Sequence, residues 1–310
     1  MKAASQTLVS PDAASALKVA PVSEKSFVAL LADLFKARLT FLVVLTTLVG
    51  FYMGSRGPTA YVLMANTVLA TALLASGAAA LNQVLEREFD AKMRRTQDRP
   101  LPSGRMTPEA ALLIGGTCAA GGLAYLALAV NLLTALLGAI TLCSYVFIYT
   151  PLKRVTTLNT VIGAIPGALP PLMGWTAARG SISEAGWGFF ALLFFWQLPH
   201  FLAIAWMYRD EYKKAGFVML PLVDPQGVRT GRQALCHTLG LLPISLCPFI
   251  FRLAGPIYLF GALALGAAFL WQAWRFAREL NQVRARALFY ASIIYLPLLL
   301  ILMVIDKVRV

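Results

Sequence analysis

The chain has 310 residues, of which 59% are hydrophobic and 13% are charged, and its mean hydropathy is +0.71. Soluble domains carry roughly a quarter charged residues, so this composition excludes an ordinary soluble protein and predicts an integral membrane protein. The net charge of +13 does not indicate nucleic-acid binding, because no basic segment forms a polar domain with interleaved aromatic residues. We therefore expect a lipid bilayer and no nucleic acid as the surroundings of this chain.

Eight stretches of the chain contain no Asp, Glu, Lys or Arg, and each is long enough to cross a bilayer. They are residues 39–55, 57–85, 110–152, 155–178, 185–208, 233–251, 253–274 and 287–305. A helix needs about 20 residues to span about 30 Å of hydrocarbon, so the third stretch is expected to cross twice and to turn near Asn131. The sequence therefore predicts nine transmembrane helices.

The residues before the first predicted span differ in composition from the rest. Residues 1–26 contain prolines and charges of both signs and lack the apolar core of a signal peptide, which predicts a mobile N-terminal tail. The remaining residues, 27–310, are predicted to form a single transmembrane domain. The acidic residues of the tail are also unlike an Arg-rich transit peptide, which favours a bacterial plasma (inner) membrane over a mitochondrial one.

Lysine and arginine are divided unevenly between the two sides of the predicted spans. Twenty-two lie in the tail or directly after even-numbered spans, and only Arg56, Arg179, Arg252, Lys307 and Arg309 lie on the other side. Cytoplasmic loops carry the excess of these residues, so we expect a cytoplasmic N-terminus and a C-terminus on the opposite side. Cations that bind substrate are not independent indicators of this orientation.

An acidic cluster follows the second predicted span. If the helix continues through the cluster, Asn82, Glu86 and Asp90 recur at every fourth residue and lie on one face. Mg²⁺ in proteins commonly takes one or two carboxylates and completes its coordination with water and substrate phosphate oxygens. Arg95 and Arg99 follow and could hold a diphosphate through charge-assisted hydrogen bonds. The pattern indicates a site for Mg²⁺ and a diphosphate.

The alternative interpretation of this cluster is a solvated loop in which acids and arginines form weak surface ion pairs. Asn82 argues against it, because an amide about two turns inside an apolar span is costly unless a partner satisfies it. We therefore favour the metal and diphosphate site.

A second acidic cluster follows the sixth predicted span. Asp210 and Glu211 could supply carboxylates to a second metal, and Lys214 could add a phosphate contact. Lys153 and Arg154 are predicted on the same side of the membrane and are further phosphate candidates, although each such cation is otherwise an interface anchor. The two acidic clusters are four spans apart, so spans one to four and five to eight are predicted to form a parallel repeat, with the ninth helix added.

His200 is an ionisable residue inside the sixth predicted span. It lies eleven residues before Glu211, so on one continuous helix the two share a face and His200 lies about 16 Å deeper, pointing into a cavity. Three roles stay open from the residues alone: ligation of a haem iron, acceptance of a proton, or a hydrogen bond between helices.

Several spaced motifs resemble a known family. Residues 82–100, with the pattern N-x3-E-x3-D-x2-M-x-R-T-x2-R-P, resemble the first signature of the UbiA-type intramembrane prenyltransferases. Residues 36–40, 149–175, 199–205 and 211–221 resemble, more narrowly, the protohaem IX farnesyltransferases, also called haem O synthases. The similarity runs from about residue 27 to about residue 305 and keeps the order of the motifs.

The resemblance implies an all-α bundle of two four-helix halves plus a ninth helix, with a central cavity that opens to the cytoplasmic face. It implies that Mg²⁺ and farnesyl diphosphate bind at the mouth, and that the farnesyl group is transferred to the 2-vinyl group of protohaem IX to give haem O. A haem A synthase is then a candidate partner.

The resemblance also assigns roles to individual positions. It assigns the first metal and diphosphate motif to Asn82, Glu86 and Asp90, the phosphate-binding run to Arg95 and Arg99, the acidic position of the second motif to Glu211 with Asp210 beside it, and the family's intramembrane histidine to His200. Lys36 and Arg38, from the matching run at residues 36–40, join Lys153, Arg154 and Lys214 as further candidates for diphosphate binding. Three positions depart from the family pattern: Val218 where proline is usual, and Glu86 and Glu211 where aspartate is common. Glutamate still binds Mg²⁺, so these departures concern geometry rather than activity.

Three other functions are possible. A related enzyme could prenylate a quinone precursor or chlorophyllide, but the residues around His200 and residues 166–175 favour haem. A transporter would carry ionisable groups across the membrane depth, whereas here Asp, Glu, Lys and Arg lie near the ends of the spans. A non-catalytic haem-binding homologue would not need the intact metal and arginine motifs.

Overall fold

The computed structural model describes residues 26–308, and its regular structure is helical apart from one isolated β-bridge between Ala254 and Lys307. Nine spans in this range are long and apolar enough to cross a membrane, which confirms the predicted number. They are α2 (Ala37–Gly54), α3 (Tyr61–Asp90), α4 (Pro108–Ala129), α5 (Leu132–Cys143) continued by a π-helical turn (Ser144–Tyr149) and α6 (Thr150–Leu152), α7 (Asn159–Arg179), α8 (Glu184–Met207), α11 (Val228–Ser245) continued by α12 (Cys247–Ile250), α13 (Pro256–Arg278) and α14 (Gln282–Ile305). Three short helices, α1 (Phe27–Leu34), α9 (Arg209–Ala215) and α10 (Leu220–Val223), lie outside the spans. The predicted N-terminal tail, except for Ser26, lies outside the described residues.

The turn predicted near Asn131 is confirmed. Helix α4 ends at Ala129 and α5 begins at Leu132. The side-chain oxygen of Asn131 accepts a hydrogen bond from the backbone N–H of Thr134 at 2.8 Å, which caps the first turn of α5. A polar residue in the middle of a long apolar stretch therefore marks the point where one span stops and the next starts.

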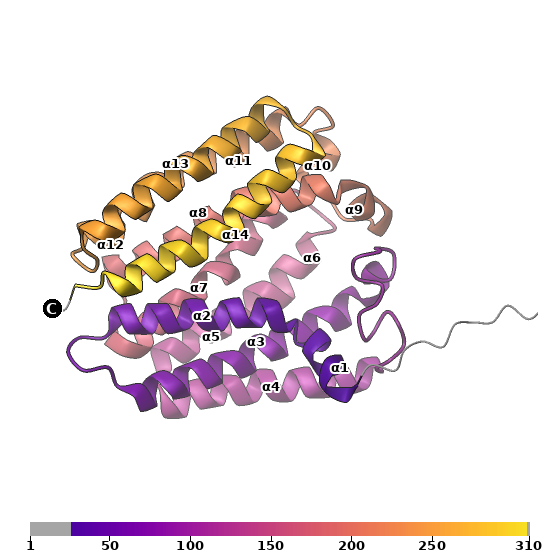
Figure 1. The fold of residues 1–310 in the computed structure, drawn as a ribbon. Helices are drawn as coiled ribbons and strands as arrows, with labels where there is room; N and C mark the ends of the chain where they lie inside the picture. The colour runs from indigo at the N-terminus through magenta and orange to yellow at the C-terminus, as the bar shows by residue number, and fades with distance from the viewer. Residues whose placement is uncertain (1–25, 309–310) are drawn as a thin grey trace, which may run out of the picture.

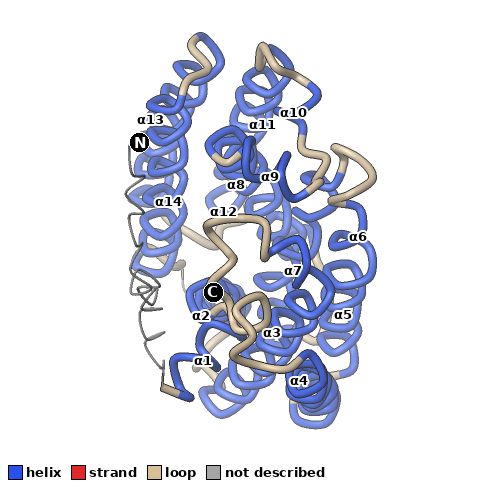
Figure 2. The backbone as a smooth tube through the Cα atoms, turned by 90° about the vertical axis from the view of Figure 1, so that its right-hand side faces the viewer, coloured by secondary structure: helices blue, strands red, loops and turns tan. Residues whose placement is uncertain are grey.

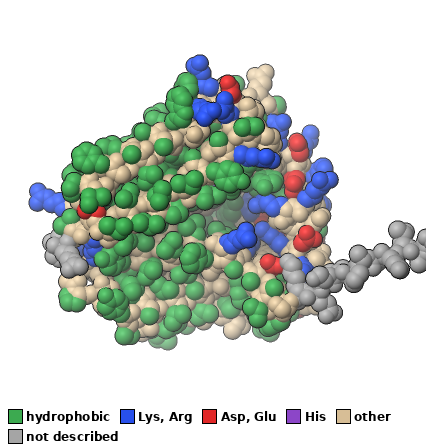
Figure 3. Space-filling model, viewed as in Figure 1, with side chains coloured by type: hydrophobic (Ala, Val, Ile, Leu, Met, Phe, Trp, Pro, Cys, Tyr) green, Lys and Arg blue, Asp and Glu red, His purple; other side chains and the backbone are tan. Residues whose placement is uncertain are grey.

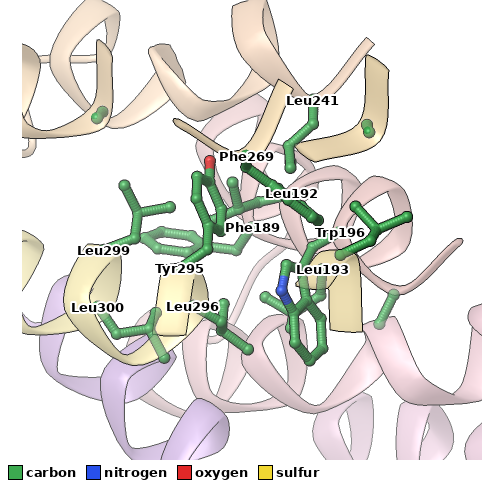
Figure 4. Close-up of a cluster of buried hydrophobic side chains, with 14 of the residues drawn as sticks. Phe189, Leu192, Leu193, Trp196, Leu241, Phe269, Tyr295, Leu296, Leu299 and Leu300 are labelled. Atoms are coloured by element: carbon green, nitrogen blue, oxygen red, sulfur yellow. The ribbon is translucent and has the colours of Figure 1, made fainter. Parts of the chain in front are cut away.

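The spans pack around two hydrophobic clusters, one for each half of the chain. The first cluster joins α3, α4 and α5 to α7, and the second joins α8, α11, α13 and α14 to α2 and α7. Figure 1 shows α13 and α14 on one side of the molecule and α3 and α4 on the other, and Figure 2 shows the same separation from the end that carries α1 and α9. Figure 4 shows Phe189 and Trp196 of α8 inside the second cluster, against Phe269 and Tyr295.

Helix α7 connects the two clusters and is the most enclosed of the spans within residues 26–308, since 72% of the residues in its most apolar stretch are buried. It crosses α2 at very short range. A Cβ added at Gly174 would meet the carbonyl oxygen of Thr47 and, at 2.6 Å, the backbone nitrogen of Phe51, and one added at Gly50 would meet the carbonyl of Pro171. Small residues allow this approach of two backbones, which is how helices commonly associate in lipid.

Charged residues gather at one end of the bundle. Figure 3 shows Lys, Arg, Asp and Glu side chains at the end that carries α1 and α9, and an apolar surface over the spans. On this face the surface is also hollowed between α14 and the charged end of α2. The predicted central cavity stays a prediction.

At the opposite end of the bundle, the residues that follow α14 bind the ends of α2 and α13. Lys307 Nζ donates to the carbonyls of Tyr52 at 2.5 Å and Ser55 at 3.0 Å, at the C-terminal end of α2. Asp306 Oδ2 accepts from the backbone N–H of Tyr258 at 2.7 Å, in the first turn of α13. A cation at a helix C-terminus and an anion at a helix N-terminus both match the helix dipole, so this segment ties α2 to α13 and α14.

The crossing of α2 and α7 yields a stability prediction. We expect Gly174→Ala to lower the midpoint of thermal unfolding in detergent, at a cost of about 1–3 kcal/mol, because the new methyl group meets backbone atoms that cannot move aside. Gly116→Ala in α4 is the matched control, since a Cβ there meets nothing within 4 Å and alanine is the better helix former. Equal midpoints for the two variants would contradict the close crossing.

Candidate active site

The first acidic cluster lies on one unbroken helix. Helix α3 runs from Tyr61 to Asp90, as the interpretation of the cluster required. The side chains at every fourth residue are almost completely buried: Asn82 is 0%, Glu86 is 5% and Asp90 is 1% exposed. A solvated loop is therefore the wrong interpretation, and these three polar side chains need partners within the protein.

Asn82 is held from two sides. Lys36 Nζ donates to its side-chain oxygen at 2.5 Å, and its side-chain amide donates to Thr150 Oγ1 at 2.9 Å. Lys36 lies between α1 and α2 with φ of +48°, a left-handed conformation that turns the chain sharply there. Its ammonium also donates to the hydroxyl of Tyr145 at 3.3 Å. Hydrogen bonds around the buried amide of Asn82 thus join α3 to Lys36 and to Tyr145 and Thr150, which are far apart in the sequence.

Glu86 and Asp90 are each paired with a cation. Lys153 Nζ donates to Glu86 Oε1 at 2.7 Å, and a guanidinium nitrogen of Arg99 donates to Asp90 Oδ2 at 2.6 Å. Both cations are largely buried, with 13% of the Lys153 side chain and 23% of the Arg99 side chain exposed. Each buried carboxylate therefore has one short, charge-assisted hydrogen bond.

The two lysines differ in how burial and charge act on them. Burial lowers the pKa of Lys36 to about 7, and the nearby positive charge of Arg99 acts in the same direction. Burial also acts to lower the pKa of Lys153, but the Glu86 carboxylate, followed by the two tyrosines Tyr149 and Tyr145, outweighs burial and raises it above the usual range. An additional anion beside Lys36 would favour its charged form.

The oxygen donors of this face fit Mg²⁺ that is bound together with a phosphate ligand. One amide oxygen and two carboxylates lie on successive turns of α3, and each already has a positive group beside it. Within residues 26–308 no group of three or more His, Cys, Asp and Glu side chains converges into an all-protein metal cage. Mg²⁺ does not need such a cage, because it binds through one or two carboxylates and takes its other ligands from water and phosphate.

The second acidic cluster lies at the same end of the bundle and contacts the loop after α3. The backbone N–H of Arg95 donates to Glu211 Oε2 at 3.4 Å, and its guanidinium donates to the hydroxyl of Tyr212 at 3.2 Å. The guanidinium also lies 5.3 Å from the ring centre of Tyr208. Arg95 therefore joins the two predicted motifs directly.

An aromatic layer lies next to these contacts. The rings of Phe89 and Phe217 are 5.6 Å apart, and the ring of Tyr212 is 6.0 Å from that of Phe217. The guanidinium of Arg154 lies 4.6 Å from the ring centre of Phe89, and the ammonium of Lys153 lies 5.9 Å from that of Phe217. Residues from both halves of the chain thus form one apolar layer bordered by cations.

The loop that carries Lys153 is held by the second half of the chain. The backbone N–H of Val218 donates to the carbonyl of Lys153 at 2.7 Å, and the carbonyl of Val218 accepts from the side chain of Asn159 at 2.7 Å. Proline, which is usual at position 218 in the family that the motifs resemble, has no N–H and could not make the first bond. This departure therefore adds a contact that positions the lysine bound to Glu86.

His200 does not share a continuous helix with Glu211. Helix α8 ends at Met207 and α9 begins at Arg209. The prediction that His200 and Glu211 share one helix face, with a fixed distance along one axis, therefore loses its basis. The residue between the two helices, Tyr208, has φ of −111° and ψ of +20°, outside the helical range. The premise of an unbroken helix was wrong, because an apolar run does not reveal a change of helix direction at its polar end.

The imidazole of His200 contacts α14. Its Nδ1 lies 2.7 Å from Ser292 Oγ, and the ring stacks with Trp196, with centres 5.4 Å apart, and with Phe289, with centres 5.0 Å apart. Ser292 Oγ also donates to the carbonyl of Phe289 at 2.5 Å. A hydroxyl has one hydrogen, so Nδ1 carries the proton in this arrangement and Nε2 keeps its lone pair. The hydrogen bond between helices, one of the three roles left open, is thus present.

Seven predicted site residues have no hydrogen bond or ion pair to Asn82, Glu86 or Asp90 within the described part of the chain: Arg38, Arg95, Arg154, His200, Asp210, Glu211 and Lys214. Of these, Arg38, Asp210 and Lys214 are exposed and, within the same residues, also have no hydrogen bond with Arg95 and no cation–π contact with the aromatic layer. The sequence interpretation also missed the contributions of the π-helical turn, where Tyr145 and Tyr149 face the two lysines. Thr150 was part of a recognised motif, but only the tertiary contact shows that it binds Asn82. The π-helical turn itself has no signal in the sequence pattern.

Comparison with known proteins identifies the family. The sequence model of the UbiA prenyltransferase family matches residues 43–296. The chain belongs to this family. The predicted fold class, an all-α membrane bundle of the UbiA type, is therefore confirmed.

Relatives in the UbiA family resemble this chain along nearly its whole length. A protein of Solibacter usitatus called protoheme IX farnesyltransferase is 45% identical over 284 residues, which cover 89% of this chain and 97% of the relative. A protein of Myxococcus xanthus with the same name is 44% identical over 280 residues, which cover 90% of this chain and 94% of the relative.

Solved structures of lower sequence identity share the fold. A digeranylgeranylglyceryl phosphate synthase superposes with a TM-score of 0.76 at 15% identity, covering 90% of this chain and 98% of its own. A UbiA homologue from Archaeoglobus fulgidus bound to GPP and Mg²⁺ superposes with a TM-score of 0.62 at 16% identity, covering 88% of this chain and 99% of its own.

The pair Lys153 and Glu86 yields a second stability prediction. We expect Lys153→Met to lower the thermal midpoint at a cost of about 3–5 kcal/mol, because it leaves the Glu86 carboxylate buried without a cation. Adding Glu86→Gln to this variant should restore part of the loss, because a neutral amide needs no counter-charge. Arg154→Met is the control on the neighbouring exposed cation. Similar midpoints for the Lys153 and Arg154 variants would show that the buried pair is not needed.

Proposed function

We propose that this protein transfers the farnesyl group of farnesyl diphosphate to the 2-vinyl group of protohaem IX, which forms haem O and releases diphosphate. The observation that carries the proposal is the buried row of Asn82, Glu86 and Asp90, each hydrogen-bonded to a lysine or arginine side chain, at the charged end of an apolar bundle. The names of the relatives support the identity of both substrates.

We assign diphosphate binding to the cations that now hold the oxygen row. Lys36, Lys153 and Arg99 each have nitrogen donors within reach of α3, and Arg95 adds a guanidinium on the side of the second cluster. Bound at Asn82, Glu86 and Asp90, Mg²⁺ would supply further positive charge to the leaving diphosphate. Asp210 and Glu211 remain candidate ligands of a second ion, of which Glu211 is the one in contact with Arg95.

The chemistry follows from where the positive charge lies. The bond between C1 of the farnesyl group and the diphosphate oxygen breaks, and its electron pair leaves with the diphosphate, whose charge the lysines and arginines stabilise. The vinyl electrons of protohaem then attack C1, and water adds to the resulting cation with loss of a proton, which yields a hydroxyethylfarnesyl side chain. The apolar helices keep other water away from the allylic cation.

We assign His200 to the porphyrin side of the reaction. Its Nδ1 is occupied by Ser292, so the free lone pair of Nε2 is available either to ligate the haem iron or to accept the proton. The aromatic rings of Trp196 and Phe289 stack against the imidazole and restrict its orientation.

The proposal includes the setting of the enzyme. The composition of residues 1–26 favours a bacterial inner membrane, and the distribution of Lys and Arg favours a cytoplasmic N-terminus, so that the charged end of Figure 3 faces the cytoplasm. A haem A synthase as partner stays a prediction. The alternative acceptors, a quinone precursor or chlorophyllide, are not favoured by the names of the relatives.

Activity can be tested in membranes that contain the protein. With protohaem, farnesyl diphosphate and Mg²⁺ we expect haem O by mass spectrometry, and Asp90→Ala should lower turnover by at least about 100-fold, because it removes a carboxylate of the metal and diphosphate site. Asp98→Ala, an exposed aspartate of the same loop region, is the control and should keep most of the activity. Folded protein that makes no haem O would overturn the assigned acceptor.

The role of His200 can be separated from its contact with Ser292. If the imidazole ligates iron, His200→Gln should weaken protohaem binding and change the haem absorbance spectrum. If it accepts a proton, haem binding should persist while turnover falls. Ser292→Ala removes only the hydrogen bond that orients the ring, so it should cause a smaller loss of turnover than His200→Gln. If both variants kept wild-type turnover, His200 would neither ligate the haem iron nor accept the proton.

A further inference from the structure

A polar and aromatic face at the charged end of α13 takes no part in the proposed reaction. Trp271, Trp274, Arg275 and Arg278 follow one another at intervals that place them on one side of the helix, over its last two turns. Trp271 is 54% exposed and Trp274 is 38% exposed, so both indole rings are accessible from the surface of the bundle. These exposed rings lie next to two arginines rather than in an apolar core.

The side chains of this face are arranged in a defined way. The two indole rings stack with centres 4.9 Å apart and an angle of 21° between their planes, and the guanidinium of Arg278 lies 5.1 Å from the ring centre of Trp274. Arg284, from the start of α14, donates to Glu279 at 2.9 Å across the turn between the helices. Together these residues line a surface cavity of about 180 Å³, bordered by Trp271, Trp274, Arg275, Arg278, Glu279 and Arg284.

The cavity carries an excess of positive charge. Glu279 is its only carboxylate and already pairs with Arg284. Arg275 and Arg278 have no carboxylate partner among residues 26–308. Two guanidinium groups beside a cavity that is large enough for several waters suit a phosphate group, which arginine binds through paired hydrogen bonds.

The tryptophans indicate that this phosphate belongs to a lipid. Indole rings prefer the boundary between headgroups and acyl chains, and here they lie on the apolar side of the arginines along α13. A soluble anion would not need a stacked aromatic surface below its binding site. We propose that the Trp271, Trp274, Arg275 and Arg278 face binds the headgroup phosphate of an anionic phospholipid, with the start of its acyl chains against the two indoles.

General attraction between basic residues and anionic membranes does not explain this arrangement. Arg229 and Arg232 at the start of α11 have the same spacing as Arg275 and Arg278, are exposed, and lie at the same end of the bundle. Within residues 26–308 neither arginine forms a cation–π contact with a tryptophan, and neither lines the cavity beside α13. They therefore provide a matched comparison of equal charge. The proposal does not depend on the chemistry of the reaction.

The experiment measures lipid contact by tryptophan fluorescence. The full chain is placed in nanodiscs of phosphatidylcholine with an equal fraction of either brominated phosphatidylglycerol or brominated phosphatidylcholine, since bromine quenches nearby indoles. We expect stronger quenching by the phosphatidylglycerol, and loss of this difference in Trp271→Phe/Trp274→Phe. Native mass spectrometry should show that Arg275→Gln/Arg278→Gln weakens retention of phosphatidylglycerol on the order of tenfold.

Arg229→Gln/Arg232→Gln is the control and should keep both the quenching difference and the retained lipid. Equal losses in the two arginine pairs would overturn the proposal in favour of unspecific surface charge. Equal quenching by the two brominated lipids in the wild-type protein would also overturn it. Millimolar inorganic phosphate should not abolish the difference at matched ionic strength, because abolition would mean that free phosphate rather than lipid occupies the cavity. If Arg275→Gln/Arg278→Gln does not fold, the test rests on Trp271→Phe/Trp274→Phe, in which the quenching difference between the two brominated lipids should be lost.

Discussion

The structure depends on the need to pair charged and polar groups that are buried at the end of a membrane bundle. Without a partner, the buried carboxylates of Glu86 and Asp90 would each lower the free energy of unfolding by several kcal/mol. This is roughly as much as the net stability of a small domain. Their partners come from different segments: Lys153 follows α6, and Arg99 lies in the loop after α3. Asn82 accepts a hydrogen bond from Lys36, the residue directly before α2. Satisfying one row of side chains therefore brings the charged ends of several helices together.

The same pairing prepares the site for a diphosphate. The cations are already desolvated and directed at the oxygen row, so a substrate that replaces or shares these bonds meets positive charge that needs little rearrangement. The apolar part of the bundle has the complementary task of excluding water. Its rigidity depends on close helix contacts such as the crossing of α2 and α7 at Gly50 and Gly174. Electrostatics at one end and tight packing below it are thus two requirements of the same reaction.

Contacts between the two halves of the chain complete the site. Val218 binds the backbone of Lys153, and Arg95 binds Glu211 and Tyr212, so each half positions groups that belong to the other. His200 belongs to the second half and is oriented by Ser292 of α14. The last helices therefore have two roles: α14 orients the histidine, and the last two turns of α13 carry the arginines and tryptophans that we assign to a lipid.

The sequence by itself determined the features that depend on local periodicity and on transfer to lipid. Charge-free lengths predicted the spans, Asn131 predicted the turn, and a spacing of four predicted that Asn82, Glu86 and Asp90 share a face. Only the tertiary structure decided which cation binds each of these groups, because the partners are up to 67 residues away and no local pattern specifies such contacts. It also decided the surroundings of His200, since the break between α8 and α9 removes the helical register on which the sequence argument relied.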